Sequence, residues 1–261
     1  MRKVLLARLK QGHQTTGFPV ALPVLPDRFR GQPIIERTRC PDDCQACADA
    51  CPTNAITLTE SSSRIDLGRC IFCTDCLDAC PNDAITHARD HRLATATRQA
   101  LVVQENQAPR LAHALDKKAR RLFGHALSLR QVSAGGCNAC EMEINVLGSV
   151  LFDMGRFGIT LAASPRHADG LIITGPITTN MAQPLRIAYD AVPSPKIVIA
   201  VGACALSGGL FASNPEQSDG VESILPIDLA IPGCPPSPYT ILDGLLRLLA
   251  RIEDDRTTMP A

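Results

Sequence analysis

The second half of the chain alternates short apolar runs with longer amphipathic segments. Apolar runs of strand length predict five buried strands, at Leu127–Val132, Gly158–Ala163, Gly170–Thr174, Lys196–Val201 and Pro226–Ile231. Helical periodicity predicts three helices, over Glu143–Phe152, Met181–Ala191 and Tyr239–Ile252. Strands that alternate with helices form parallel sheets with helices on their faces. The pattern therefore predicts a doubly wound α/β domain over residues 127–261.

Four cysteines follow predicted strands of this domain. Cys137 and Cys140 lie in a Gly-Gly-Cys-Asn-Ala-Cys-Glu segment after the first strand, and Cys204 and Cys234 lie in Gly-rich turns after the fourth and fifth. Functional groups of such sheets gather at the carboxyl ends of the strands. We therefore expect the four thiolates to hold one iron–sulfur cluster. The alternative is a thioredoxin-like dithiol at Cys137 and Cys140, which would leave Cys204 and Cys234 without a role.

Residues 40–80 contain eight further cysteines in an internal repeat. The run from Cys44 to Ile56 matches the run from Cys73 to Ile85 at an offset of 29 residues. The second copy has the bacterial ferredoxin spacing Cys-x₂-Cys-x₂-Cys-x₃-Cys-Pro, in which three cysteines bind one cluster and the fourth binds the other. This pattern assigns Cys40, Cys44, Cys47 and Cys80 to cluster A, and Cys70, Cys73, Cys76 and Cys51 to cluster B.

The first copy departs from the pattern, because three residues rather than two separate Cys40 from Cys44. We expect a local bulge at residues 41–43 and a four-cysteine site, with a labile or three-iron cluster as the alternative. The negative charges of Asp42 and Asp43 would lower the potential of this cluster, since they oppose added electrons. Zinc is the alternative for both sites, because zinc sites also use Cys-x₂-Cys, although interleaved runs that end in Cys-Pro are not typical of them.

Two basic segments flank the acidic cysteine-rich block of residues 36–90. Four prolines between residues 19 and 33 predict an extended arm over residues 1–35. Leu111, Leu115 and Leu122 recur at helical spacing and predict a linker with a helix within residues 91–126. The basic segments are either solvated surfaces or contacts for acidic partner subunits or anionic lipid heads.

Composition narrows the classes of function. Apolar residues make up 45% of the 261 residues and aromatic residues 3%, so an aliphatic core is affordable. Acidic domains without aromatic side chains for base stacking argue against nucleic-acid binding. We see no secretory signal and no apolar run of the roughly 18–20 residues that span a bilayer. We therefore expect a cytoplasmic protein whose clustered cysteines bind metal rather than form disulfides.

Two further sets of motifs carry a family resemblance. The C-terminal half resembles the small subunit of membrane-associated NiFe hydrogenases of the formate hydrogenlyase type, and the homologous B subunit of respiratory complex I. Its matching motifs are Ser164–Asp169, Thr174–Pro176, Gly202–Cys204 and Pro232–Pro236. The N-terminal half resembles the two-cluster ferredoxin subunit of the same complexes. Its matching motifs are Thr15–Pro19, Arg28–Gly31 and Gly68–Cys73, with the eight cysteines.

The resemblance implies a fusion of two neighbouring subunits: an α+β bacterial-ferredoxin domain over residues 36–90 and a flavodoxin-like cluster domain over residues 127–261. Complex I subunits carry adjacent cysteines at the first ligand position, whereas the hydrogenases carry Cys-x₂-Cys, as Cys137 and Cys140 do here. The resemblance therefore implies an oxidoreductase subunit that relays electrons through three [4Fe–4S] clusters and has no catalytic residue of its own. A complex I-like quinone oxidoreductase module and a non-catalytic zinc-binding scaffold are the alternatives.

The same resemblance implies the partners of the chain. They are a NiFe hydrogenase large subunit that holds the nickel, antiporter-like or complex I-like membrane subunits, and ferredoxin or formate dehydrogenase as electron donor. The protein would lie on the inner face of the cell membrane through these subunits. Glu141 would charge the start of the next helix, tune the cluster or relay a proton. Arg166 and His167 would serve either a structural turn or redox-linked protonation.

Overall fold

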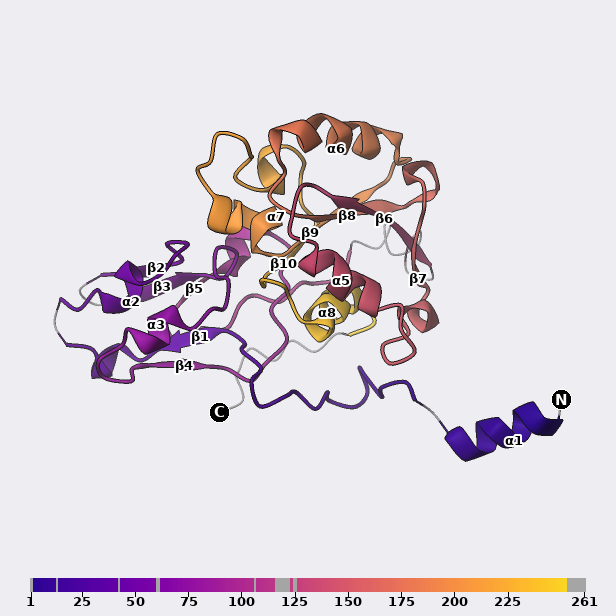
Figure 1. The fold of residues 1–261 in the computed structure, drawn as a ribbon, viewed down its shortest axis with the longest axis horizontal. Helices are drawn as coiled ribbons and strands as arrows, with labels where there is room; N and C mark the ends of the chain where they lie inside the picture. Colours follow the sequence, from indigo (N-terminus) through magenta and orange to yellow (C-terminus); the bar gives the residue numbers. More distant parts are fainter. Residues whose placement is uncertain are drawn as a thin grey trace.

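A computed structural model of the chain describes residues 2–12, 14–41, 43–59, 62–105, 107–115, 123 and 126–252 (Figure 1). The helices are α1 (Arg2–Gln11), α2 (Ala46–Asp49), α3 (Asp75–Asp78), α5 (Ala139–Val146), α6 (Thr179–Ala191), α7 (Ala203–Ser207) and α8 (Pro238–Leu248). The strands are β1 (Pro33–Ile35), β2 (Ile56–Leu58), β3 (Ser63–Asp66), β4 (Ile85–His87), β5 (Val102–Gln104), β6 (Leu127–Ser133), β7 (Ile159–Leu161), β8 (Gly170–Thr174), β9 (Ile197–Val201) and β10 (Leu229–Ile231).

The C-terminal half is built on a parallel sheet of the predicted strands. Its strand order is β10-β9-β8-β6-β7, and all four neighbouring pairs are parallel. Counted from β6, this is the 2-1-3-4-5 order of flavodoxin-like folds. Strands β8 and β9 are buried at every position, which explains why they read as continuous apolar runs rather than as alternating ones. The predicted α/β class is confirmed.

Helices cover both faces of this sheet, with α6 on one side and α5 and α8 on the other (Figure 1). Alternate strand residues point to opposite faces, and the two cores divide accordingly. In β9, Ile199 packs in the core with α5 and α8, whereas Val198 and Ala200 pack in the core with α6. The second core also contains Ile65 and Leu67. The N-terminal half therefore shares one apolar core with the sheet.

The cysteine-rich half forms two small antiparallel sheets around two short helices. Strands β1 and β4 pair in one sheet, and β2, β3 and β5 form the other. Helices α2 and α3 and strands β2 and β4 recur at the 29-residue offset of the sequence repeat. This arrangement is the predicted ferredoxin-type α+β architecture.

The segments around this half differ from the prediction. Strand β1 comes from the predicted arm and β5 from the predicted linker, so both sheets extend beyond residues 36–90. Pairing across the sheet, which no local pattern reveals, recruits them. Leu111 and Leu115 lie outside any helix. The Lys- and Arg-rich part of the predicted linker helix lies outside the described residues.

The prediction of an extended arm is wrong for the first residues, where α1 is helical. All four prolines lie beyond its end, so nothing in Arg2–Gln11 prevents a helix. Val4, Leu5 and Leu9 of α1 are exposed, and Figure 1 shows α1 away from the rest of the fold. Among the described helices, none is both long and apolar enough to cross a membrane.

Candidate iron–sulfur sites

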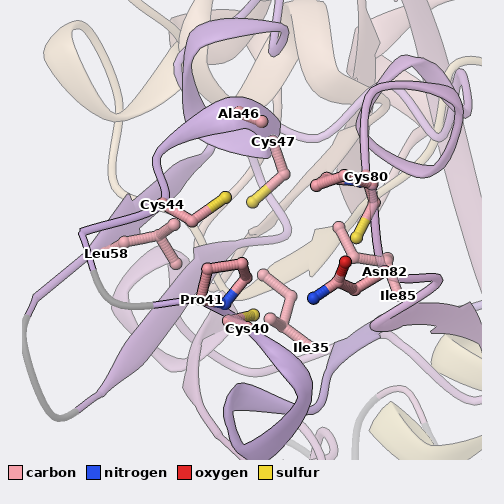
Figure 2. Close-up of a pocket in the computed structure, with 11 residues that line it drawn as sticks. Ile35, Cys40, Pro41, Cys44, Ala46, Cys47, Leu58, Cys80, Asn82 and Ile85 are labelled. Atoms are coloured by element: carbon pink, nitrogen blue, oxygen red, sulfur yellow. The ribbon is translucent and has the colours of Figure 1, made fainter.

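The first pocket lies between the two copies of the repeat (Figure 2). Its volume is about 300 Å³ with its opening to solvent included. Figure 2 shows four cysteine side chains around it: Cys40, Cys44, Cys47 and Cys80. Ile35 of β1 and Ile85 of β4 also line it, so an apolar wall faces the thiols. The structure thus gathers the four cysteines that the repeat assigns to cluster A.

A second pocket of about 370 Å³ lies on the other side of the repeat. Its four cysteines are Cys51, Cys70, Cys73 and Cys76. Burial raises the pKa of the Cys70 thiol to about 12 and that of Cys76 to about 11, and the neighbouring thiolates add to both shifts. These are the four residues assigned to cluster B, so the exchange of the fourth cysteine between the copies agrees with the geometry of both pockets.

The fourth cysteine of each copy accepts the same hydrogen bond. The backbone N–H of Ala55 donates to Cys51 Sγ at 3.2 Å, and the N–H of Ala84 donates to Cys80 Sγ at 3.2 Å. In both cases the donor lies four residues after the cysteine. Hydrogen bonds to sulfur stabilise the thiolate and tune the potential of a cluster. The two pockets therefore repeat their electrostatic surroundings as well as their ligands.

The extra residue of the first copy lies before the turn that both copies share. Asp43 and Phe72 immediately precede the second cysteine of each run, and their φ angles are 58° and 57°. This left-handed conformation is uncommon for residues other than glycine. Because Asp43 and Phe72 match at the 29-residue offset, the insertion falls between Cys40 and Asp43. The predicted bulge centres on Asp42, which lies outside the described residues.

The third site forms at the carboxyl edge of the parallel sheet. Cys137 follows β6, Cys140 lies in the first turn of α5, Cys204 lies in α7, and Cys234 follows β10. Burial raises the pKa of Cys140 to about 12 and that of Cys204 to about 11, and the other thiolates of the set add to both shifts. Cys137 and Cys234 are exposed. The four cysteines are therefore neighbours, and two of them face outward.

Two glycines let the backbone approach the sulfurs of this third site. Gly202 has a φ of 91°, and a Cβ at this position would lie 2.5 Å from Cys140 Sγ. Gly209 has a φ of 59°, and a Cβ there would lie 2.9 Å from Cys204 Sγ. Only glycine combines this backbone conformation with the absence of a side chain. Gly202 and Gly209 thus define the space beside the two inner thiols.

Glu141 is a buried carboxylate beside the third site. It is 4% exposed and accepts hydrogen bonds from Ser133 Oγ at 2.5 Å and Thr174 Oγ1 at 2.6 Å. Ser133 and Thr174 are register partners at the ends of β6 and β8. After burial and the other thiolates, the charge of Glu141 is a further cause of the raised pKa of Cys140 and Cys204. Glu141 therefore lies in the first turn of α5, as predicted, and also places negative charge next to the site.

The donor chemistry of all three sites fits iron–sulfur clusters. Four thiolates together repel one another, so they need the positive charge of a metal core. Among the described side chains, no group of three or more His, Cys, Asp or Glu is arranged to hold a single metal ion. A [4Fe–4S] cluster does not require such convergence, because each of four cysteines binds it through a separate iron.

The remaining residues singled out by sequence lie elsewhere. Arg166 and His167 are exposed in the short 3₁₀ helix Pro165–His167, which Ser164 caps. This helix precedes β8, whereas the cysteines follow the carboxyl ends of strands. Ser133 and Thr174 were not predicted as partners of Glu141. Their position at the ends of adjacent strands was the available signal.

A doubly wound sheet with four cysteines at its edge, joined to two pockets of four cysteines, defines an iron–sulfur protein of the oxidoreductase class. Residues 137–248 match the family model of the NADH ubiquinone oxidoreductase 20 kDa subunit, and residues 39–84 match a 4Fe–4S dicluster domain. The chain belongs to the 20 kDa subunit family and carries the dicluster domain ahead of it. It is therefore a subunit of the hydrogenase and complex I type.

Three curated relatives illustrate this similarity. The chain is 39% identical over 132 residues to a probable membrane-bound hydrogenase subunit, mbhJ, of Pyrococcus furiosus, covering 51% of this chain and 79% of the relative. It is 42% identical over 153 residues to formate hydrogenlyase subunit 7 of Escherichia coli, covering 59% and 58%. It is 42% identical over 126 residues to an NADH-quinone oxidoreductase subunit of Desulfovibrio desulfuricans, covering 48% and 68%.

Proposed function

We propose that the chain is the electron-relay subunit of a membrane-associated NiFe hydrogenase of the formate hydrogenlyase type. It would hold three [4Fe–4S] clusters, each of which supplies a one-electron redox centre. Cluster A is assigned to the first pocket, cluster B to the second pocket, and the third cluster to Cys137, Cys140, Cys204 and Cys234. The observation that carries this proposal is the grouping of all twelve cysteines into three sets of four.

The order of the three sites supports a relay. Cys47 of the first set is among the causes that raise the pKa of Cys76 in the second set, after burial and nearer thiolates. Cys73 of the second set is likewise among the causes that raise the pKa of Cys234 in the third. Cluster B would therefore lie between the other two, and electrons would pass along the order A, B and third cluster, or in reverse.

The exposed side of the third site indicates where the chain meets a redox partner. Cys137 and Cys234 face solvent in the isolated chain, so a large subunit placed over them would bring its nickel–iron centre near the third cluster. The Cys-x₂-Cys spacing of Cys137 and Cys140 supports a hydrogenase partner, because complex I relatives carry adjacent cysteines at this position. Proton reduction or hydrogen oxidation would take place in that partner.

Residues of this chain would tune the relay without taking part in proton reduction themselves. The N–H groups of Ala55 and Ala84 would stabilise negative charge at the ferredoxin-type clusters. The charge of Glu141 would lower the potential of the third cluster, because it opposes an added electron. Ser133 and Thr174 would hold that carboxylate in place.

The remaining parts of the proposal concern the assembly. The donor would be ferredoxin or a formate dehydrogenase, and antiporter-like or complex I-like subunits would hold the chain at the inner face of the membrane. A quinone oxidoreductase module is the second candidate, since the family model is that of a complex I subunit.

Purification of the native complex through a tag on this chain separates the two candidates. The hydrogenase proposal predicts nickel in a co-purified subunit and hydrogen formation with a low-potential donor. The control is the same complex with Cys140→Ser, which should retain nickel but lose hydrogen formation. A complete complex that lacks nickel and oxidises its donor only with quinone would overturn the hydrogenase proposal.

A further inference from the structure

A buried ion pair lies where the loop of Cys70 meets the helix of Cys204. Arg98 belongs to the 3₁₀ helix Arg98–Leu101, in the segment that connects the two halves. Its guanidinium donates to both carboxylate oxygens of Asp66, at 2.7 and 2.8 Å. Its Nε also donates to the carbonyl oxygen of Leu206 at 2.9 Å. One side chain, 12% exposed, therefore contacts both halves at once.

A second hydrogen bond runs parallel to this contact. Ser207 Oγ donates to the carbonyl oxygen of Gly68 at 3.0 Å. A Cβ at Gly68 would lie 2.5 Å from Arg98 Cζ, so the turn packs directly on the guanidinium. We call the set Asp66, Gly68, Arg98, Leu206 and Ser207 the Arg98 bridge.

Both ends of the Arg98 bridge belong to elements that carry predicted cluster ligands. The carboxylate of Asp66 accepts from the N–H of Gly68 at 3.0 Å, and its carbonyl oxygen accepts from the N–H of Cys70 at 3.0 Å. Leu206 and Ser207 lie in α7, the helix that contains Cys204. The bridge therefore joins a ligand loop of cluster B to a ligand helix of the third cluster.

We propose that Arg98 and Ser207 are positioning residues that fix the separation of cluster B from the third cluster. This inference rests on the proposed function. Electron transfer between clusters depends steeply on distance, and a hydrophobic core alone permits small shifts of one half against the other. The bidentate contact and the parallel Ser207 bond restrict both distance and rotation. Arginine suits this role because its planar fork binds a carboxylate in a fixed geometry while Nε remains available.

The test compares Arg98→Met and Ser207→Ala with a matched control, Arg69→Met, in the anaerobically purified full chain. Arg69 Nε lies 3.7 Å from Asp66 Oδ2, and its half-exposed side chain lies on the same side of the junction as Cys70. Arg69→Met thus removes the same charge near the same carboxylate without removing a contact between the halves. Ser207→Ala removes a contact between the halves without changing charge.

The measured quantities are iron content, the midpoint potential of each cluster, and the distance between cluster B and the third cluster from pulsed EPR relaxation enhancement. Arg98→Met and Ser207→Ala should retain all iron but give a longer or broader distance distribution, with several-fold slower transfer between the two clusters. Arg98→Lys should not restore the narrow distribution, because an ammonium lacks the fork. Arg69→Met should shift a potential and leave the distance unchanged.

Two results would overturn the positioning role. One is an unchanged, narrow distance in both Arg98→Met and Ser207→Ala; if Arg98→Met does not fold, Ser207→Ala decides alone. The other is an equal change in Arg69→Met, which would mean that charge rather than contact matters. Failure of the proposed function is a different result, because the wild-type chain itself would then lack cluster B or the third cluster.

Discussion

The two ferredoxin-type pockets and the third site surround their sulfurs in different ways. Each pocket lies within the repeat, and each draws its fourth cysteine from the other copy. The third site lies at the edge of a parallel sheet, with Cys137 and Cys234 exposed. A backbone N–H donates to a sulfur in both pockets, whereas the third site has a buried carboxylate beside it.

This difference separates relay sites from an exit site. A pocket enclosed by one chain can only exchange electrons with neighbouring clusters. A cluster with two exposed ligands can also approach the active centre of a partner subunit. The carboxylate gives the third cluster a different charge environment from that of clusters A and B. The predictions below test whether the three sites differ in these respects.

Loss of one ligand at each kind of site should give the largest effect. Cys140→Ser should remove the third cluster and leave A and B intact, because no ligand is shared between the sheet and the repeat. We expect iron to fall from about 12 to about 8 atoms per chain. Iron analysis with EPR of the reduced chain measures this change.

Cys76→Ser is the matched variant, in the second pocket. It should also cost one cluster but leave the third cluster spectrum unchanged. Loss of all iron in either variant would contradict the independence of the two regions, provided that circular dichroism shows a folded chain.

Gly202→Ala should act on the third site alone. The added methyl group would meet Cys140 Sγ at 2.5 Å, and the φ of 91° would strain any residue with a Cβ. Most of the third cluster should therefore be lost, whereas A and B remain. Gly148→Ala is the control, because its Cβ would meet only one carbonyl oxygen at 3.4 Å. Full cluster content in Gly202→Ala would show that the backbone does not approach the site so closely.

Removal of iron should proceed in a definite order. In the isolated chain an oxidant with an iron chelator should attack the third site first, because Cys137 and Cys234 are exposed while Cys47 is buried. We expect several-fold faster loss of the third EPR signal than of the other two. A bound large subunit should abolish this difference. Simultaneous loss of all signals would contradict the contrast between an enclosed pair and an open site.

Glu141→Gln should have the smallest effect, a shift of one potential. Removal of the negative charge favours the reduced cluster, so the midpoint potential of the third cluster should rise by on the order of 60 mV, about tenfold in a one-electron equilibrium. Redox titration followed by EPR measures it. The potentials of A and B should not move. Glu143→Gln is the control, two residues further along α5. A rise in all three potentials would indicate a general change of structure.

The sequence predicted the parts of the fold that depend on burial. Strands β8 and β9 are buried along their whole length, so their apolar runs identified them. The start of α5 and the whole of α7 were missed. Both contain cysteines of the third site, Cys140 and Cys204, whose positions follow from the site rather than from helical periodicity.

Contacts between distant residues were beyond local patterns. Strand β5 forms by pairing with β3, and its three residues carry no signal of their own. Arg98 contacts Leu206 across 108 positions, so only the folded chain reveals the bridge. The grouping of the cysteines, by contrast, was accessible from the sequence, because the repeat and the strand ends restrict which thiols can meet.

Native mass spectrometry of the anaerobically purified full chain, with iron and sulfide analysis, tests the central claim most directly. The account predicts the polypeptide mass plus three [4Fe–4S] clusters, with about 12 iron and 12 sulfide per chain. It also predicts that Cys140→Ser loses the mass of one cluster. A chain that carries two clusters, or zinc without sulfide at any of the three sites, would contradict the account.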